Sequence, residues 1–317
     1  MKAVLIDDNQ LKYDETSDPI LEENKLIVSV ISAGINGADI LQKKGGYPAP
    51  KPWSQNIPGI ELAGKVVKAG NLIKDFQVGD LIMTIVGGGA QAELAVVEPE
   101  YCLKIPEGLD PIKAGAFCET FFTAYDALIS RAKLKIGADV LIVGAAGGVG
   151  TAAIQITSLY KCQTTALVRD LKFKNNLKEL GTTQVLTKLE DQKYDIILDL
   201  VAGSEVNSRI SNLKTEGRYV IIGVGAGFKG DINYLKIMEK RAYLTGSTLR
   251  SRDKYEKKLL KDEIEKSLIP FVKDKFIGIP IHKTYEFKDA NQAYLDFENG
   301  GKFGKLVLIN PNFNYGN

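Results

Sequence analysis

Residues 140–150 read Val-Leu-Ile-Val-Gly-Ala-Ala-Gly-Gly-Val-Gly, and they carry the strongest indication of the fold class. Its four apolar residues predict a buried strand, and the amphipathic segment 149–160 predicts a helix. Small residues between a strand and a helix allow a tight turn, where backbone N–H groups can bind a pyrophosphate. Ala145 stands where the usual G-x-G-x-x-G motif has its first glycine, so a turn that serves packing alone is the alternative. We predict a dinucleotide-binding turn over residues 144–150.

From about residue 123 to 266, apolar strands alternate with amphipathic helical segments. Such alternation, with strands that are apolar throughout, predicts a parallel sheet covered by helices on both faces. The sequence therefore predicts an α/β fold with a doubly wound Rossmann domain over residues 123–266. The expected strands are 139–144, 164–168, 194–200, 218–224 and 242–248, and the expected helices are 149–160, 172–180, 205–213 and 233–241.

The two ends of the chain have a different pattern. Residues 1–122 contain short apolar runs separated by glycine, proline and asparagine, which predicts a small β-rich barrel or sandwich. Residues 267–317, the last part of the chain, also depart from the strand–helix alternation of the Rossmann region. The expected strands near the N-terminus are 26–33, 63–70, 78–86 and 92–97; towards the C-terminus we expect helices at 254–273 and 289–298 and strands at 279–287 and 305–309.

Composition excludes several classes of protein. The chain has 317 residues, 44% hydrophobic and 25% charged, with a formal net charge of +2, so it gives no basic surface for nucleic acid or an anionic membrane. Three cysteines (Cys102, Cys118, Cys162) and a single histidine (His282) make a disulfide framework or a zinc cluster hard to build. Charge comes too early for a signal peptide, and the longest apolar stretch is too short to span a bilayer. The sequence predicts a soluble, cytoplasmic protein.

The end of the second expected strand bears on the choice between NAD and NADP. An acidic residue there would accept from the ribose 2′-hydroxyl of NAD, whereas a 2′-phosphate favours arginine or lysine. Val168 takes the acidic position, and Arg169, Lys172 and Lys174 follow. Asp170 is the counter-argument, and a solvated helix face is the alternative for the lysines. We predict NADP, bound as NADPH.

Several motifs occur in an order that is typical of one family. They are Gly34–Asp39, Pro58–Gly64, Gly79-Asp80, Gly87–Glu93, Phe122–Tyr125, Gly144–Gly150 and Thr248–Asp253. From about residue 25 to 310 the chain resembles the zinc-free, zeta-crystallin-like quinone oxidoreductases of the medium-chain dehydrogenase/reductase superfamily, most closely their stress-inducible branch. The resemblance implies a GroES-like catalytic domain, built from residues 1–122 and 267–317 and interrupted by the Rossmann domain.

The resemblance also implies chemistry without a metal. Asn36 stands where zinc members carry a cysteine ligand, Ile60 stands where they carry histidine, and their four-cysteine lobe is missing. Without a Lewis acid the acceptor must already be electrophilic, as a quinone is. By resemblance Tyr47 is a hydrogen-bond donor in the active cleft, with Asn36 and Asp39 as polar cleft residues. Packing of Tyr47 under nearby prolines, and helix capping by Asn36 and Asp39, are the alternatives.

Further residues are expected to contact the cofactor. From the turn these are Gly144, Ala145, Ala146, Gly147, Gly148, Val149 and Gly150; from the resemblance they are Thr123, Gly223, Val224, Thr248, Leu249, Arg250, Gly304 and Lys305. The run Gly87-Gly88-Gly89 predicts a hairpin turn, which could line the mouth of the substrate site. Cys118 is expected to be a small, buried side chain.

The sequence thus predicts an NADPH:quinone oxidoreductase that acts on a small molecule. An NADPH-dependent enone or 2-alkenal double-bond reductase is the alternative among enzymes, and a non-catalytic NADPH-binding or RNA-binding protein is the alternative outside them. The apolar strand 242–248 is expected at the edge of the Rossmann sheet, and a bare apolar edge favours pairing. By resemblance this edge makes a homodimer.

Overall fold

The computed structural model describes residues 1–313 and divides the chain into two compact units. The first unit contains Met1–Glu119 and returns from Leu249 onward, and the second contains Thr120–Thr248. The first boundary lies three residues before the expected one, while the second lies 18 residues earlier than residue 266. The return begins earlier because helix α8 (Lys254–Ser267) packs within the first unit, where Lys257 Nζ donates to the Arg250 carbonyl over 2.9 Å.

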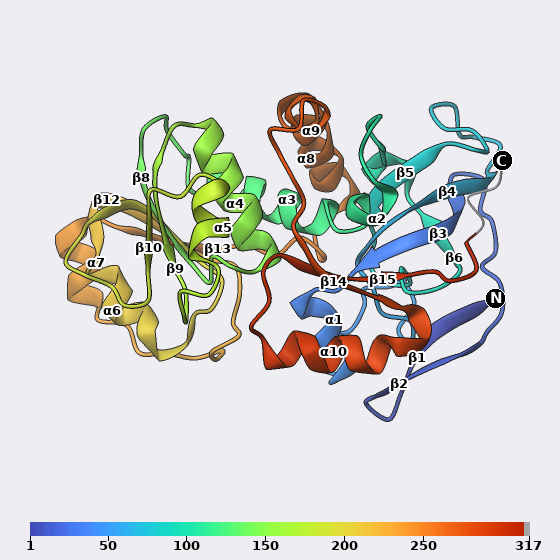
Figure 1. Cartoon of the computed structure of the whole chain (residues 1–317), viewed down its shortest axis with the longest axis horizontal. Helices are drawn as coiled ribbons and strands as arrows, with labels where there is room; N and C mark the ends of the chain where they lie inside the picture. The colour runs from blue at the N-terminus through green and yellow to red at the C-terminus, as the bar shows by residue number, and fades with distance from the viewer. Residues whose placement is uncertain (314–317) are drawn as a thin grey trace. The chain divides into compact units, whose positions relative to one another are not determined.

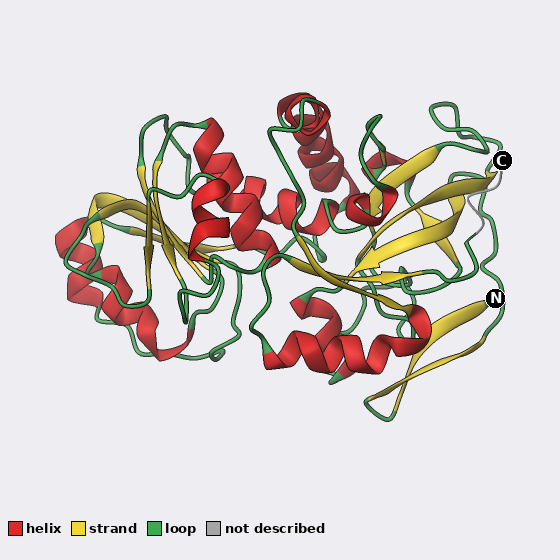
Figure 2. Ribbon diagram, in the orientation of Figure 1, coloured by secondary structure: helices red, strands yellow, loops and turns green. Residues whose placement is uncertain are grey.

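The second unit is a six-stranded parallel sheet in the order β10-β9-β8-β11-β12-β13, with helices on both faces (Figures 1 and 2). This is the doubly wound arrangement, so the predicted fold is confirmed. Its strands are β8 (Asp139–Val143), β9 (Gln163–Leu167), β10 (Gln184–Leu186), β11 (Tyr194–Asp199), β12 (Leu213–Ile221) and β13 (Tyr243–Gly246). Its helices are α4 (Gly148–Leu159), α5 (Lys174–Glu179), α6 (Val206–Ile210) and α7 (Tyr234–Lys240), and α3 (Cys118–Tyr125) leads into the unit.

The strand order places a switch point at the carboxyl ends of β8 and β11. β8 lies between β9 and β11, so the chain leaves β8 towards one side of the sheet and β11 towards the other. Val140–Val143 pair in register with Ile196–Asp199, and all four residues of β8 are buried because both faces are covered. In open parallel sheets, ligands bind at this crevice.

The first unit is built around a mainly antiparallel sheet with strand order β14-β15-β3-β4-β5-β7, in which only the β14–β15 pair is parallel among the described strands, and β6 also pairs with β3. Figure 1 shows the red C-terminal strand β15 beside the blue strand β3, because Val307–Ile309 pair antiparallel with Ser32–Gly34. The strands are β3 (Leu26–Gly34), β4 (Glu61–Ala69), β5 (Leu81–Ile85), β6 (Leu94–Val97), β7 (Leu103–Lys104), β14 (Ile281–Glu286) and β15 (Lys305–Ile309). The chain therefore completes its first sheet with its last strand.

Shorter elements surround this sheet, and the apolar pattern indicated only the helices near 254–273 and 289–298 among them. Strands β1 (Lys2–Asp7) and β2 (Gln10–Glu15) form a hairpin whose turn has positive φ at Asp8 and Asn9. The helices are α1 (Gly37–Lys43), α2 (Pro111–Ala114), α8, α9 (Ile269–Lys273) and α10 (Ala290–Asn299). None of the helices within residues 1–313 combines the length and the apolarity that crossing a bilayer requires.

Candidate functional site

The turn after β8 has the backbone that a pyrophosphate cradle needs. Gly144 has φ +80°, and a Cβ there would lie 2.9 Å from Val201 Cγ2. Gly147 caps α4, and a Cβ on Gly150 would lie 2.5 Å from the Ala145 carbonyl oxygen. The first N–H groups of α4 have no partner within the helix and carry its positive end. The turn can therefore accept an anionic ligand, although the cofactor contacts of residues 144–150 stay a prediction.

The loops beside this turn are held by Asp199 at the end of β11. Its Oδ1 accepts from the N–H groups of Val201 and Ala202 at 2.9 and 2.8 Å. Its Oδ2 accepts from Arg209 Nη1 at 2.9 Å and from the Tyr219 hydroxyl. All of this lies at the switch point, so the buried carboxylate fixes the loop against which Gly144 packs.

The second loop at this edge follows β12 and is shaped for close approach. A Cβ on Gly223 would lie 2.2 Å from the Leu200 carbonyl oxygen, and the Gly223 N–H points to the Asp199 carbonyl at 3.3 Å. Only glycine fits such contact. With the turn after β8 this makes two glycine-dependent backbone surfaces at one sheet edge, which fits a nicotinamide dinucleotide. Val224 follows in the same loop.

Arg169, predicted to bind the 2′-phosphate, lies exposed just beyond the end of β9. Asp170 Oδ1 accepts from the Lys172 N–H at 2.9 Å, so this carboxylate closes a local turn. The Lys172 ammonium lies 5.0 Å from the ring centre of Phe173, and exposed Lys174 begins α5. The acid that argued for NAD is engaged by its own backbone, while Arg169 stays exposed.

The other expected cofactor residues are divided between the units. Thr123 in α3 and exposed Thr248 belong to the second unit. Buried Leu249 belongs to the first, as does Gly304, whose φ of +75° and close approach to the Pro280 carbonyl favour glycine. The roles expected for these residues stay predictions.

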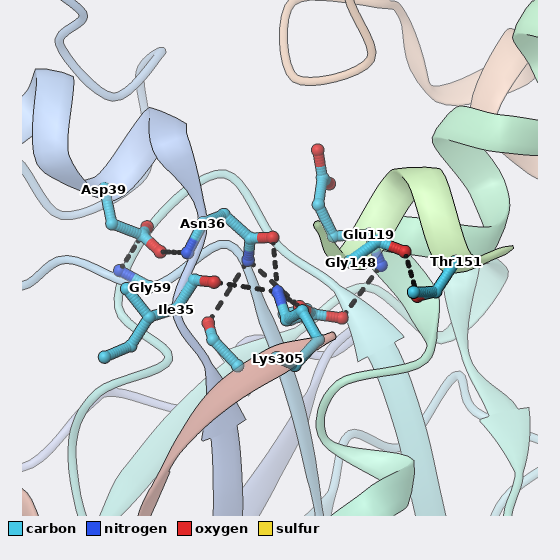
Figure 3. A network of polar contacts seen from close by, with 10 residues as sticks. Ile35, Asn36, Asp39, Gly59, Glu119, Gly148, Thr151 and Lys305 are labelled. Carbon is cyan, nitrogen blue, oxygen red and sulfur yellow. Dashed lines mark hydrogen bonds and ion pairs between the residues drawn. The ribbon is translucent and has the colours of Figure 1, made fainter. Parts of the chain in front are cut away.

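In the first unit, the expected residues Lys305 and Asn36 lie in one buried polar network. The Lys305 ammonium donates to the Ile35 carbonyl (2.8 Å), Asn36 Oδ1 (2.6 Å) and Glu61 Oε1 (2.7 Å) (Figure 3). Asn36 Nδ2 also donates to Glu61 Oε1 at 3.0 Å, and Glu61 Oε2 accepts from the Glu119 N–H at 2.9 Å. The Lys305 ammonium is therefore engaged by groups of this unit. Its expected contact with a cofactor stays a prediction.

Asp39 lies next to this network and holds the start of α1. Its two carboxylate oxygens accept from the N–H groups of Asn36 (2.8 Å) and Gly59 (3.1 Å) (Figure 3). Complete burial raises the pKa of Asp39 to about 7, although the Asn36 N–H, Lys305 and Arg250 favour its charged form. The contacts of Asp39 correspond to the helix-capping alternative.

Tyr47 lies in the loop that follows α1, half-buried beside Arg250. The guanidinium carbon of Arg250 lies 5.2 Å from the Tyr47 ring centre, and its Nη1 donates to the Tyr47 carbonyl at 3.0 Å. Burial raises the pKa of the Tyr47 hydroxyl, and Arg250 opposes that rise. Tyr47 is therefore a neutral phenol at neutral pH, able to donate a hydrogen bond.

Two functional-site residues escaped the sequence analysis, Glu61 and Asp199. Glu61 stands in the Gly59-Ile60-Glu61 run but was not singled out, although a carboxylate inside an apolar strand is a signal of a buried partner. A Cβ on Gly34 would lie 2.4 Å from Glu61 Oε1, which explains the glycine before Asn36. Asp199 ends an apolar strand at the ligand edge of a parallel sheet, which is also a detectable signal.

The remaining candidates are Cys118 and His282. Cys118 is fully buried, as expected, and burial raises the pKa of its thiol well above its usual value. His282 accepts from the Phe303 N–H through Nδ1 at 3.4 Å. Among residues 1–313, no group of three or more His, Cys, Asp or Glu side chains is arranged to hold a metal ion.

Comparisons with known proteins agree with this architecture. Residues 22–107 match the alcohol dehydrogenase GroES-like domain, and residues 174–308 match a zinc-binding dehydrogenase family. The quinone oxidoreductase of Homo sapiens is 30% identical over 308 residues, with 92% of this chain and 91% of that protein covered. The synaptic vesicle membrane protein VAT-1 homolog-like of Mus musculus is 26% identical over 333 residues, with 95% and 78% covered. The crystal structure of the human VAT-1 homolog-like protein superposes with a TM-score of 0.84 at 25% identity and covers 99% of each chain.

Proposed function

This chain belongs to the medium-chain dehydrogenase/reductase superfamily of oxidoreductases, and we propose that it catalyses the NADPH-dependent, metal-free reduction of quinones. The observation that carries the proposal is the Lys305 ammonium held between Asn36, Glu61 and the Ile35 carbonyl. By resemblance, Asn36 stands at the cysteine ligand of zinc members. Here its side chain is bonded to a cation that the chain itself supplies.

The donor set at this position argues against a catalytic zinc. Zinc sites in this chemistry use sulfur, nitrogen and carboxylate ligands with one open position. Asn36 offers a weak amide oxygen, Ile60 offers no ligand atom, and the Glu61 carboxylate is already engaged by an ammonium and two further donors. An acceptor that must be polarised by a metal, such as a simple ketone, is therefore a poor substrate.

The glycine-dependent loops after β8 and β12 would hold the cofactor, and Arg169 would bind its 2′-phosphate. A guanidinium can bind a phosphate by two parallel hydrogen bonds, which an exposed arginine at a strand end is free to form. The engagement of Asp170 by the Lys172 N–H supports NADPH over NADH. When bound, the nicotinamide supplies a hydride.

The chain itself then has to orient the quinone and meet the charge that develops on its oxygen. We assign the hydrogen bond to that oxygen to Tyr47, whose hydroxyl stays protonated and whose ring is held beside Arg250. A donor fixed before the reaction stabilises the developing oxyanion without reorganising. Asp39 holds the backbone at the start of α1, and Asn36 accepts from Lys305; their expected place as polar cleft residues stays a prediction.

The test is a steady-state assay with NADPH or NADH and three acceptors: 9,10-phenanthrenequinone, a 2-alkenal and a simple ketone. We expect turnover of the quinone with NADPH, unchanged after prolonged dialysis against EDTA. Faster turnover of the alkenal than of the quinone would indicate a double-bond reductase instead of a quinone reductase. Loss of activity when zinc is removed would refute metal-free chemistry.

Arg169→Ala tests the cofactor assignment separately. The variant should weaken NADPH binding by about tenfold, since a charged hydrogen bond contributes ~1.5 kcal/mol or more, and leave NADH binding nearly unchanged. The dissociation constants are measured by cofactor fluorescence, with Lys178→Ala, an exposed lysine in the following helix α5, as a control for loss of charge. Equal losses of affinity for NADPH and NADH would contradict the assignment of Arg169 to the 2′-phosphate.

A further inference from the structure

The loop that carries Tyr47 has few hydrogen bonds of its own. Through Gly46 it is tied to the end of α1, since the Gly45 and Gly46 N–H groups donate to the carbonyls of Gln42 and Leu41 at 2.9 Å. Beyond Tyr47 the sequence is Pro-Ala-Pro-Lys-Pro, and a proline has no N–H to donate. We define this loop as residues 44–56. Beyond Gly46 the Trp53 N–H donates to the Pro50 carbonyl at 2.9 Å, and the Asn56 carbonyl accepts from the Ile6 N–H at 2.7 Å. Near Tyr47 itself, side chains supply the anchors.

Arg250 supplies the anchor at Tyr47. The residue is 6% exposed, and its guanidinium has three acceptors on three different segments. Nε donates to the Gly87 carbonyl at 2.8 Å, Nη1 to the Tyr47 carbonyl at 3.0 Å, and Nη2 to Gln42 Oε1. A planar group that bonds to three segments fixes their relative positions, which a lysine cannot do.

Gln42 extends this anchor to the far end of the loop. Its Nε2 donates to the Gln55 carbonyl at 2.9 Å, and Gln55 Nε2 donates back to the Ala49 carbonyl at 2.6 Å. The loop is therefore held at positions 47, 49 and 55 by a chain of side chains that begins at Arg250.

The three glycines 87–89 explain how the loop packs against this anchor. A Cβ on Gly87 would lie 2.2 Å from Trp53 Cδ1, and a Cβ on Gly88 would lie 2.8 Å from the Ser54 carbonyl oxygen. The loop thus lies directly on the backbone whose Gly87 carbonyl accepts from Arg250. The run does not form the expected hairpin turn, because β5 before it pairs with β4 and β7, while β6 after it pairs with β3. It is a packing surface for the loop of Tyr47.

The charge of Arg250 makes this arrangement costly unless it serves a purpose. Its three hydrogen-bond acceptors are two backbone carbonyls and an amide, and none is a carboxylate. Burying a cation on neutral acceptors carries a desolvation penalty that an apolar residue would avoid. The carboxylates of Asp39 and Glu119 favour the charged form of Arg250. The face of the Tyr47 ring lies 5.2 Å away, and a cation beside a phenol makes its hydroxyl a better donor.

We propose that Arg250 is a positioning residue that holds the Tyr47 loop, and with it the Tyr47 hydroxyl, in the geometry needed for reduction; the catalytic part of this inference rests on the function proposed above. The residue acts through Tyr47 and does not need to touch substrate or cofactor. This positioning role differs from the cofactor contact that the resemblance led us to expect for Arg250.

Trp53 gives a readout that does not depend on activity. It is the only tryptophan of the chain and lies in the loop, on Gly87. In the full-length protein, Arg250→Gln should shift its emission to the red and raise acrylamide quenching about twofold, as expected when a segment loses its anchors. Gln42→Met should loosen the loop in the same direction. Lys258→Gln, which removes an exposed positive charge on α8, is the matched control and should change neither signal.

Kinetics then separate positioning from general damage. With saturating NADPH and 9,10-phenanthrenequinone, Arg250→Gln should lower kcat about tenfold or more, because small displacements of a reacting group are costly. The dissociation constant for NADPH should stay within about twofold. Arg250→Lys, which keeps the charge, should recover part of the rate. In a Tyr47→Phe background the Arg250→Gln change should cost little more, since its effect acts through the hydroxyl.

The two proposals fail in different ways. If the wild-type protein does not reduce quinones, the proposed function is wrong, and Trp53 still decides whether Arg250 holds the loop. Unchanged Trp53 fluorescence in folded Arg250→Gln would overturn the anchor. Full additivity of Arg250→Gln and Tyr47→Phe would overturn the action through Tyr47, as would a loss confined to NADPH affinity.

Discussion

Tyr47 shows how a residue of ordinary type gains a specific role from its surroundings. The phenol is half-buried, its pKa is raised by burial, and a guanidinium lies beside its ring. At neutral pH it can donate a hydrogen bond but is a poor source of a free proton. Its contribution to quinone reduction is therefore expected to be orientation and charge stabilisation.

Tyr47→Phe tests this role, because it keeps the ring and its packing and deletes only the donor. We expect kcat for 9,10-phenanthrenequinone to fall ten- to a hundredfold, or ~1.4–2.7 kcal/mol. NADPH affinity should change little. A thermal melt checks the fold, and an unchanged kcat would assign Tyr47 to packing under the neighbouring prolines.

Asp39 should make stability depend on pH in an unusual direction. Burial raises its folded-state pKa to about 7 from an ordinary value of 3.8, so the folded protein holds a proton that the unfolded chain releases. The resulting stabilisation is present below about pH 4 and is lost as pH rises to about 7, by up to ~4 kcal/mol. Measured against Asp39→Asn in urea unfolding, wild-type stability should decline across this window. If the difference in the free energy of unfolding between the two proteins did not change with pH, the Asp39 carboxylate would be held charged by its two N–H donors.

Between elements, one buried ion pair joins β15 to β4. Lys305 begins β15 and Glu61 begins β4, and both are almost fully buried. Removing one partner of a buried pair leaves an uncompensated charge. Lys305→Met should therefore lower the free energy of unfolding by about 3–5 kcal/mol, while Lys258→Met, at an exposed position, should cost less than ~0.5 kcal/mol.

The double variant completes this test. Lys305→Met with Glu61→Gln removes both charges, so it should be more stable than Lys305→Met alone in the same urea titrations. A single variant within about 1 kcal/mol of wild type would mean that Glu61 finds another partner or takes up a proton.

Elements whose burial is complete were the ones that the sequence predicted well. After their charged first residues, Asp139 and Lys305, β8 and β15 are apolar, and both were expected at almost the observed bounds. β10 has three residues and the β1–β2 hairpin is largely exposed, so neither produces a long apolar run. α1 depends on capping by Asp39 more than on periodicity, which is why residues 37–43 showed no helical pattern.

The site was predictable only in part, for a similar reason. The turn at 144–150 carries its chemistry in its backbone, and glycine spacing reports backbone directly. The partners of Arg250 and Lys305 are 163 to 270 residues away along the chain, so no local pattern reveals them. The resemblance identified both residues as important but could not say which groups engage their charges.

At the scale of the whole molecule, the second unit leaves one sheet edge open. β13 is the last strand of the sheet, with Tyr243 51% and Leu244 36% exposed. No residue of α7, which packs on β12, is buried, and its Tyr234, Leu235 and Met238 are all exposed. An open apolar edge flanked by an apolar helix is expected to be covered, because bare edges pair with other strands.

We therefore expect a homodimer in which two β13 strands pair across a two-fold axis, with a mass by light scattering of about twice 34.6 kDa. Two-fold symmetry brings equivalent residues close together, so Leu244→Asp places like charges near each other at the interface. This variant should shift the protein to monomer at micromolar concentration without unfolding it. Leu72→Asp, at a leucine of the first unit that is 63% exposed, is the matched control and should stay dimeric. A monomeric wild-type protein would refute the dimer. A Leu244→Asp protein that keeps its dimer mass would place the dimer contact elsewhere, because repulsion at a self-complementary interface acts in both copies at once.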